Sequence, residues 1–154
     1  MTETARLADL EDEQYFADLF TAARIETSSS KGFELWNQLE SVGNSPESTF
    51  KEFTAGTQKA IVIGEYDNYP LGYMLIELLT VDDKFATNIH EVFVDADARE
   101  VGIGEDIMDF AIDWSRANGS ALIMGRTFPG DRATKNFFER FRITARLIEV
   151  SKDL

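Results

Sequence analysis

Residues 91–105 read EVFVDADAREVGIGE, and this stretch decides the fold that the sequence predicts. It starts near the end of residues 87–94, where apolar and polar side chains alternate and predict a strand. It leads into residues 103–117, where apolar side chains recur at helical spacing and predict an amphipathic helix. Gly102 lies in the turn between them, and Gly104 lies in the first turn of the predicted helix. Such a turn points free backbone N–H groups and the positive end of the helix dipole at one place, where they can bind an anion.

Two common phosphate-binding loops do not fit this turn. A dinucleotide-binding loop needs a third glycine, but Ile107 stands three residues after Gly104. A P-loop needs a Gly-Lys-Ser/Thr sequence, which the chain does not contain. Glu105 and Asp106 favour the start of a helix, but they oppose a phosphate unless their side chains point away. From spacing alone, an anion site and a turn that merely needs two small residues both stay open.

The remaining segments extend this strand and helix into an α/β (α+β) fold. Strands are predicted over residues 4–7, 59–65, 71–80, 87–94, 121–127 and 143–150, and helices over residues 11–25, 33–39, 46–53 and 103–117, with a last helix capped by Asp131. In a regular strand, Ile89 and Glu91 lie on one face of the sheet with Phe93. His90 then lies on the opposite face, unless a bulge intervenes.

Length, charge and composition indicate the number of domains and exclude several kinds of partner and site. The 154 residues are typical of one domain, and we expect a single domain over residues 1–154. The 15 Lys and Arg residues against 28 Asp and Glu residues give a net charge of −13, which argues against nucleic acids and anionic membranes and favours a cationic partner. The absence of Cys and the single His argue against a metal site. No membrane-spanning run or signal-peptide pattern occurs, so we expect a cytoplasmic protein.

The turn resembles motif A of the GNAT superfamily of N-acetyltransferases. The match is Arg99-x-x-Gly102-x-Gly104, placed after a strand and before a helix. Residues 129–139, PGDRATKNFFE, are similar to the second-helix motif of a bacterial subgroup with a Pro-Gly-Asp-Arg…Lys-Asn-Phe-Phe-Glu signature. The resemblance covers roughly residues 90–150, and the first half of the chain agrees in element order and in residues 71–73.

The resemblance implies a mixed, mostly antiparallel sheet of six to seven strands with helices on both faces. It implies acetyl-CoA as co-substrate, no metal, and transfer of the acetyl group to a primary amine. The residues that it assigns to acetyl-CoA are Val92, Phe93, Val94, Arg99, Glu100, Val101, Gly102, Ile103, Gly104, Asp131, Lys135 and Phe138. A backbone amide of residues 92–94 would donate to the oxyanion.

Glu91 is the first candidate for the base that takes the proton of the amine. Its apolar strand neighbours could raise its pKa. A polar strand residue without proton-transfer duty is an equal alternative, and His90 and Glu77 are weaker candidates. The chain departs from the family at Phe138, where many members have Tyr, and at Glu100, where many have Gly.

The acceptor is expected to be a small-molecule or peptide amine, cationic because the protein is acidic. Trp36 and Tyr73 are expected to line its site. The alternative is a non-catalytic GNAT-fold module that binds acyl-CoA or another protein. A homodimer is left open beside a monomer.

Overall fold

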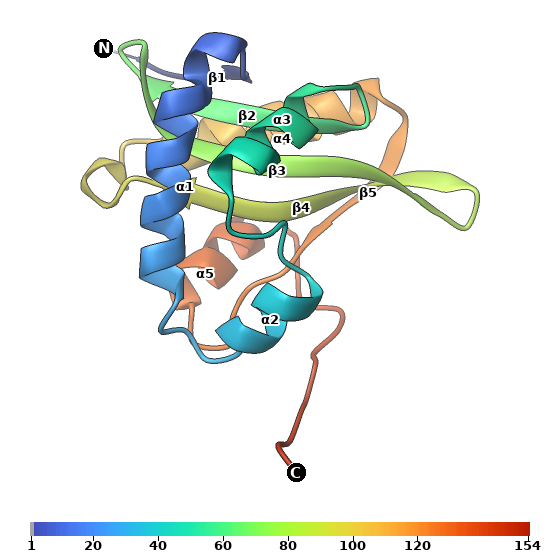
Figure 1. The fold of residues 1–154 in the computed structure, drawn as a ribbon. Helices are drawn as coiled ribbons and strands as arrows, with labels where there is room; N and C mark the ends of the chain where they lie inside the picture. Colours follow the sequence, from blue (N-terminus) through green and yellow to red (C-terminus); the bar gives the residue numbers. More distant parts are fainter. Residues whose placement is uncertain (1) are drawn as a thin grey trace.

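The computed structural model describes residues 2–154 and has one five-stranded sheet between two layers of helices (Figure 1). The spatial order of the strands equals their order in the chain. The strands are β1 (Glu3–Leu7), β2 (Lys59–Tyr66), β3 (Tyr69–Val81), β4 (Lys84–Val94) and β5 (Ser120–Gly125). β1 to β4 pair antiparallel, and β5 pairs parallel to β4. The predicted mixed, mostly antiparallel sheet is confirmed.

Tight turns set the register of the antiparallel part. Asp67 and Asn68 join β2 to β3 with φ angles of 48° and 69°, and Asp82 and Asp83 join β3 to β4 with φ angles of 51° and 64°. Two consecutive residues with positive φ match the right-handed twist of a hairpin, and Asp and Asn tolerate this conformation better than most residues.

The prediction of six to seven strands is wrong for the described residues, because residues 143–150 form no strand. After α5 the chain turns at Arg142, whose φ is 62°, and the C-terminal segment runs away from the sheet (Figure 1). Leu147, Ile148 and Val150 are 88%, 78% and 91% exposed. A strand exists only where a neighbour takes its hydrogen bonds, and apolar content alone cannot supply that neighbour.

The helices begin and end within a few residues of the predicted positions. They are α1 (Glu13–Thr27), α2 (Phe33–Leu39), α3 (Pro46–Thr54), α4 (Ile103–Ala117) and α5 (Arg132–Arg140), with short 3-10 turns at Leu10–Asp12 and Ala96–Ala98. Ser45 caps α3 and Asp131 caps α5, each by accepting from a backbone N–H three residues on. No helix of residues 2–154 combines the length and apolarity needed to cross a membrane.

Two cores cover the two faces of the sheet. On one face, α1 and α3 pack phenylalanine side chains such as Phe16 and Phe53 against Tyr73 and Ile63 of the strands. On the other face, α4 packs closely on β2, because a Cβ atom on Gly64 would lie 2.6 Å from both Ile103 and Ile107. This packing holds the N-terminus of α4 at the end of β4, which is where the sequence predicts the functional turn.

Candidate active site

The strands β4 and β5 pair along only the first half of β4. They pair from Phe85 and Ser120 as far as Ile89 and Gly125, where β5 ends. Residues 90–94 of β4 continue with β3 on one side and no strand of the described chain on the other. The free side of such a strand offers backbone N–H and C=O groups to an extended ligand. Val92, Phe93 and Val94, which the sequence assigns to acetyl-CoA, all lie in this stretch.

A β-bulge marks the start of the open stretch. Glu91 lies opposite Leu75 and Ile89 lies opposite Ile76, so His90 has no partner in the register. Glu91 and His90 both contact the α1/α3 side of the sheet, whereas Ile89 packs in the core under α4. The predicted regular alternation is therefore wrong at Ile89 and His90, since the extra residue of a bulge turns a side chain to the other face.

Glu91 is held by two donors from different elements. Its Oε1 accepts a hydrogen bond of 2.6 Å from the Tyr73 hydroxyl and one of 3.1 Å from Arg24 of α1. Its Oε2 lies 3.0 Å from an Arg24 nitrogen, yet it is buried and accepts no well-aligned hydrogen bond from the described residues. The two side chains of the ion pair are only 13% and 11% exposed. One carboxylate oxygen is thus anchored by two hydrogen bonds, while the other accepts none from the described residues.

Tyr73 lies inside the core instead of lining an open site as the sequence predicts. It is fully buried, and burial together with the Glu91 carboxylate raises the pKa of the Tyr73 hydroxyl well above 10. The hydroxyl therefore keeps its proton at neutral pH and donates a hydrogen bond to Glu91. Trp36 packs against Phe33 and Phe128, so it also contributes to the structure around the site.

Arg24 connects Glu91 to the segment before α3, and sequence reasoning missed it. Its guanidinium donates to the carbonyl oxygen of Gly43 at 2.8 Å and to Oδ1 of Asn44 at 3.1 Å. It also lies 4.1 Å from the centre of the Phe20 ring. The sequence does contain a signal for this role: Arg24 lies four residues after Phe20, in the apolar stripe of a helix. Such a position buries the guanidinium, and a buried guanidinium requires an anionic partner.

A cavity of about 350 Å³ lies between α1 and α2, with Arg24 in its wall. The lining residues are Phe20, Thr21, Arg24, Ile25, Ser28, Phe33, Asn37 and Asn44. The side-chain carbonyl oxygen of Asn37 is buried and has no hydrogen-bond partner in the described chain. A buried acceptor without a donor is costly, and this one belongs to a residue of the cavity wall.

His90 has its own carboxylate partner. Its Nε2 lies 2.8 Å from Oε1 of Glu77, and its ring makes an edge contact with Phe53. Lys59 lies 3.9 Å from the same carboxylate. The two weaker base candidates of the sequence, His90 and Glu77, therefore form one pair.

Arg99 connects the predicted loop to β4 and to α1 by hydrogen bonds. The Arg99 Nε donates to the carbonyl oxygen of Val94 at 2.9 Å, and an Nη donates to both carboxylate oxygens of Glu26 at 2.9 and 2.8 Å. A second cavity, of about 380 Å³, lies beside it. Its walls are Glu26, Thr27, Ser29, Ser30, Lys31, Arg99, Gly130 and Asp131. Arg99 and Asp131, both assigned to acetyl-CoA by the sequence, are thus brought to one cavity.

The backbone of the loop is left-handed at two positions. Glu100 has a φ of 75° and Gly102 a φ of 93°. Glycine adopts this conformation without strain, whereas glutamate pays about 1 kcal/mol for it. Gly102 is the N-cap of α4 and provides no side-chain cap, so the first N–H groups of the helix, near Ile103 and Gly104, remain for a ligand. Val101 is 42% exposed beside them.

Carboxylates surround this helix start. Burial raises the pKa of Asp106, and the nearby charges of Glu3, Asp109 and Glu105 raise it further. Glu3 of β1 comes so close that a Cβ atom on Gly102 would lie 3.0 Å from its Oε1. The backbone of this helix N-terminus therefore suits an anion, whereas the nearby carboxylates repel one.

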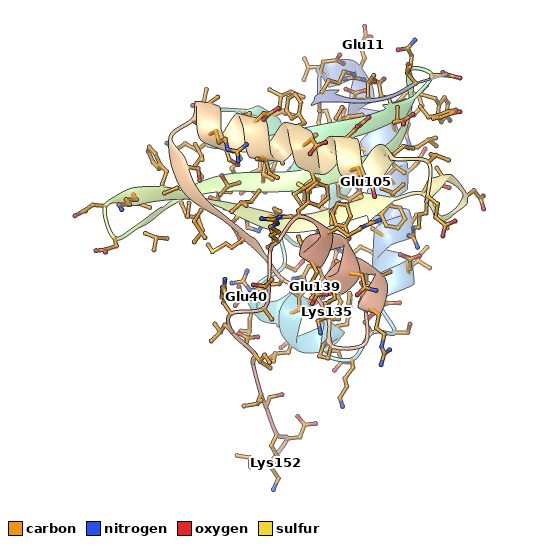
Figure 2. All side chains as sticks on the ribbon, turned by 180° about the vertical axis from the view of Figure 1, so that it is seen from behind. Glu11, Glu40, Glu105, Lys135, Glu139 and Lys152 are labelled. Atoms are coloured by element: carbon orange, nitrogen blue, oxygen red, sulfur yellow. The ribbon has the colours of Figure 1, made fainter. Side chains whose placement is uncertain are left out.

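α5 closes the site from the other side. Phe138 is buried, and a Cβ atom on Gly125 would lie 3.0 Å from its ring, so Phe138 stands where β5 leaves β4. Phe137 approaches Gly104 in the same way, at 3.1 Å. Lys135 projects from the exposed side of α5, near Glu139 (Figure 2). Among residues 2–154, no group of three or more His, Asp or Glu side chains could hold a metal ion.

Comparison with known proteins supplies the family. The pattern of the acetyltransferase (GNAT) family matches residues 14–142. None of the curated proteins that were compared matches the chain in sequence. Among solved structures, the tetramutant of a Bacillus halodurans protein superposes with a TM-score of 0.80 at 19% identity, covering 97% of this chain and 99% of the other.

Two solved acetyltransferases share the fold at low identity. Glucosamine-6-phosphate N-acetyltransferase from Arabidopsis thaliana has a TM-score of 0.72 at 18% identity, with 99% of both chains covered. AAC(6')-Iy, in complex with the bisubstrate analogue CoA-S-monomethyl-acetylneamine, has a TM-score of 0.74 at 13% identity, with 100% of both chains covered. At these identities the likeness establishes the fold.

Proposed function

The chain belongs to the GNAT family of acetyltransferases, and on that premise we propose that it transfers the acetyl group of acetyl-CoA to a primary amine. The observation that carries the proposal is the opening of the sheet after Ile89 and Gly125. The Arg99–Gly104 loop lies at the end of the open stretch, and Glu91 lies at its beginning. The Pro-Gly-Asp-Arg…Lys-Asn-Phe-Phe-Glu subgroup of this family is part of the same proposal and rests on residues 129–139.

The described residues fit acetyl-CoA at three places. The uncapped N–H groups of α4 suit its pyrophosphate, and the free side of residues 92–94 suits its pantetheine arm. Arg99, Asp131 and Lys135 would flank the phosphates and the nucleotide. When bound, acetyl-CoA would supply an activated acyl group as a thioester. The carboxylates around Asp106 weaken this fit, and we expect them to lower the affinity.

Glu91 is the proposed base. The amine nitrogen must lose a proton as it forms its bond to the acyl carbon, and the carboxylate of Glu91, whose Oε2 has no hydrogen-bond donor among the described residues, would take it. Tyr73 and Arg24 orient the carboxylate through Oε1. A backbone N–H of residues 92–94 would donate to the carbonyl oxygen that becomes negative. Phe138 has no proton to give, so the thiolate would leave without a side-chain acid from α5.

The acceptor is proposed to be a small cationic amine. The cavity between α1 and α2 shares Arg24 with the Glu91 network, and the polar side chains of Asn37 and Asn44 are in its wall. The net charge of −13 would attract a cation to the protein.

Thermal unfolding with and without acetyl-CoA tests the cofactor part of the proposal. A ligand at about 100 times its Kd stabilises the native state by about 2.7 kcal/mol, a shift in melting temperature of several degrees for this size. We expect the shift in the wild type and its loss in the double variant Arg99→Ala, Gly102→Asp. Turnover with a panel of amines then separates a transferase from a protein that only binds acyl-CoA. No shift at millimolar acetyl-CoA in a folded sample would overturn the proposal.

A further inference from the structure

Arg99 is paired with a carboxylate of the chain itself. Its Nε donates to the carbonyl oxygen of Val94 at 2.9 Å, which fixes the side chain at the end of β4. Its Nη2 donates to both carboxylate oxygens of Glu26, and its Nη1 donates to none of the described residues. A phosphate binds arginine best through two nitrogens at once. The Glu26 carboxylate therefore uses one of the two nitrogens that remain for a bidentate phosphate contact.

The position of Glu26 in α1 is not explained by the stability of the helix. Glu26 is the next-to-last residue of α1. A negative charge in the last turn opposes the helix dipole, so a carboxylate there is unfavourable for the helix. The side chains of Glu26 and Arg99 are 47% and 42% exposed, and an ion pair with that exposure contributes little to stability. The pairing therefore indicates a role other than stabilisation of the fold.

The ion pair lies where a ligand can reach it, in the wall of the cavity of about 380 Å³. The end of α1 with the loop that follows it, the loop after β4 and the loop before α5 form this cavity, and Figure 1 shows the end of α1 near α5. Four lining residues are charged, two positive and two negative: Lys31, Arg99, Glu26 and Asp131. The Asp131 carboxylate already accepts from the backbone N–H and the hydroxyl of Thr134. Glu26 is thus the anion that neutralises Arg99 in this cavity.

We propose that Glu26 is a displaceable counter-ion of Arg99, and that it leaves Arg99 when a phosphate of acetyl-CoA binds there. This inference rests on the proposed function, because it needs acetyl-CoA at the Arg99 loop. A carboxylate ligand from solution would have to compete with Glu26, which its own chain holds beside Arg99 at a high local concentration. A phosphate carries more charge and replaces it. Glu26 therefore restricts Arg99 to phosphate-bearing ligands and lowers the affinity for acetyl-CoA.

Titration calorimetry with CoA tests the exchange without turnover. Glu26→Gln removes the charge and keeps the size of the side chain, so the Kd for CoA should fall by about two- to fivefold, as expected when a half-exposed ion pair no longer has to be broken. Pantetheine, which is the arm of CoA without its phosphates, should bind the wild type and the variant equally well. Glu13→Gln is the matched control, because Glu13 is exposed at the start of the same helix, about 20 Å from Glu26 along the axis.

The same titrations in the Arg99→Met variant separate a counter-ion from a carboxylate that merely repels the cofactor. Without Arg99 there is no cation to release, so adding Glu26→Gln should no longer lower the Kd for CoA. A gain of the same size with and without Arg99 would overturn the inference. It is also overturned if the wild type binds CoA and Glu26→Gln binds it no more tightly, and the proposed function then stands. If neither protein binds CoA at millimolar concentration, both the inference and the proposed function are wrong.

Discussion

The two halves of β4 carry out different tasks. Residues 85–89 pair with β3 on one side and β5 on the other, and Ala86, Thr87 and Ile89 are almost wholly buried. Residues 90–94 pair with β3 alone and contain the bulge that turns His90 and Glu91 to the same face. One strand thus provides packing where both of its edges are paired and carries the proposed catalytic residue where one edge is free, so substitutions in the two halves should have different consequences.

The largest effect is expected for Glu91→Gln in the open half. The amide cannot accept the proton of the amine, so kcat should fall by about 100- to 10,000-fold while the affinity for acetyl-CoA stays. Steady-state rates and a binding titration on the same sample measure the two quantities. An unchanged kcat in the folded variant would show that Glu91 only orients the site.

Thr87→Val is the matched substitution in the paired half. Thr87 is fully buried, and its hydroxyl donates to the hydroxyl of Ser120 at 2.9 Å. The variant keeps the shape and loses this hydrogen bond, so the free energy of unfolding should fall by about 1 kcal/mol. Turnover should not change. A loss of turnover comparable to that of Glu91→Gln would break the distinction between the two halves.

Arg24→Met removes the cation that anchors the open half. The Glu91 carboxylate is then buried with only the Tyr73 hydroxyl as partner, so the free energy of unfolding should fall by about 3 kcal/mol. Urea unfolding measures the change. The double variant Arg24→Met, Glu91→Gln removes both charges and should recover part of the loss. If the double variant is no more stable than the single one, the ion pair does not hold this region.

Glu100→Gly should improve acetyl-CoA binding by the loop that follows the open half of β4. The φ of 75° at Glu100 suits glycine, and the substitution removes a negative charge beside the proposed pyrophosphate position. We expect a gain of about 0.5–1 kcal/mol in stability and a lower Kd for acetyl-CoA. Glu100→Asn tolerates the same conformation and serves as a second test. An unchanged Kd in both variants would argue against phosphates at this loop.

The smallest effect concerns pH at the start of α4. Burial and the charges of Glu3, Asp109 and Glu105 raise the pKa of Asp106 in the folded state. The folded state therefore binds this proton more tightly than the unfolded state, and ionisation of Asp106 above the raised pKa lowers stability. Asp106→Asn should be the more stable protein at pH 7, and its advantage should vanish as the pH falls toward 3.8.

Asp113→Asn is the control, because Asp113 is exposed on the same helix. Thermal unfolding across this pH range checks both variants. An advantage of Asp106→Asn that persists unchanged at low pH would contradict the titration of Asp106.

Many helices and caps could be predicted, because they depend on side chains that lie close together in the sequence. The limits of α2 and α4, the Asp131 cap and the helical pattern of α1 all follow from side chains within a few residues of one another. The candidate loop could be predicted as well, because Gly102 and Gly104 lie where the chain passes from a strand into a helix. The roles of its residues in binding remain predictions.

Features that depend on contacts between residues far apart in the sequence could not be predicted in this way. The bulge at His90 is a property of the β3–β4 register, which no spacing within β4 reveals. Arg24 and Glu91 are 67 residues apart, and so the partner of the predicted base was invisible in the sequence. Residues 143–150 have the composition of a strand, but no neighbouring strand lies beside them.

By itself, the sequence determined which segments form helices and hairpins, the acidic character of the protein and the family to which it belongs. These properties depend on composition, periodicity and short motifs, which act over a few residues. Folding of the whole chain is what brings Glu91 to Arg24 and Tyr73, leaves β4 unpaired on one side after Ile89 and ends the described sheet at β5. The reason is that a buried charge, an open strand edge and a strand itself each exist only through partners brought together by folding.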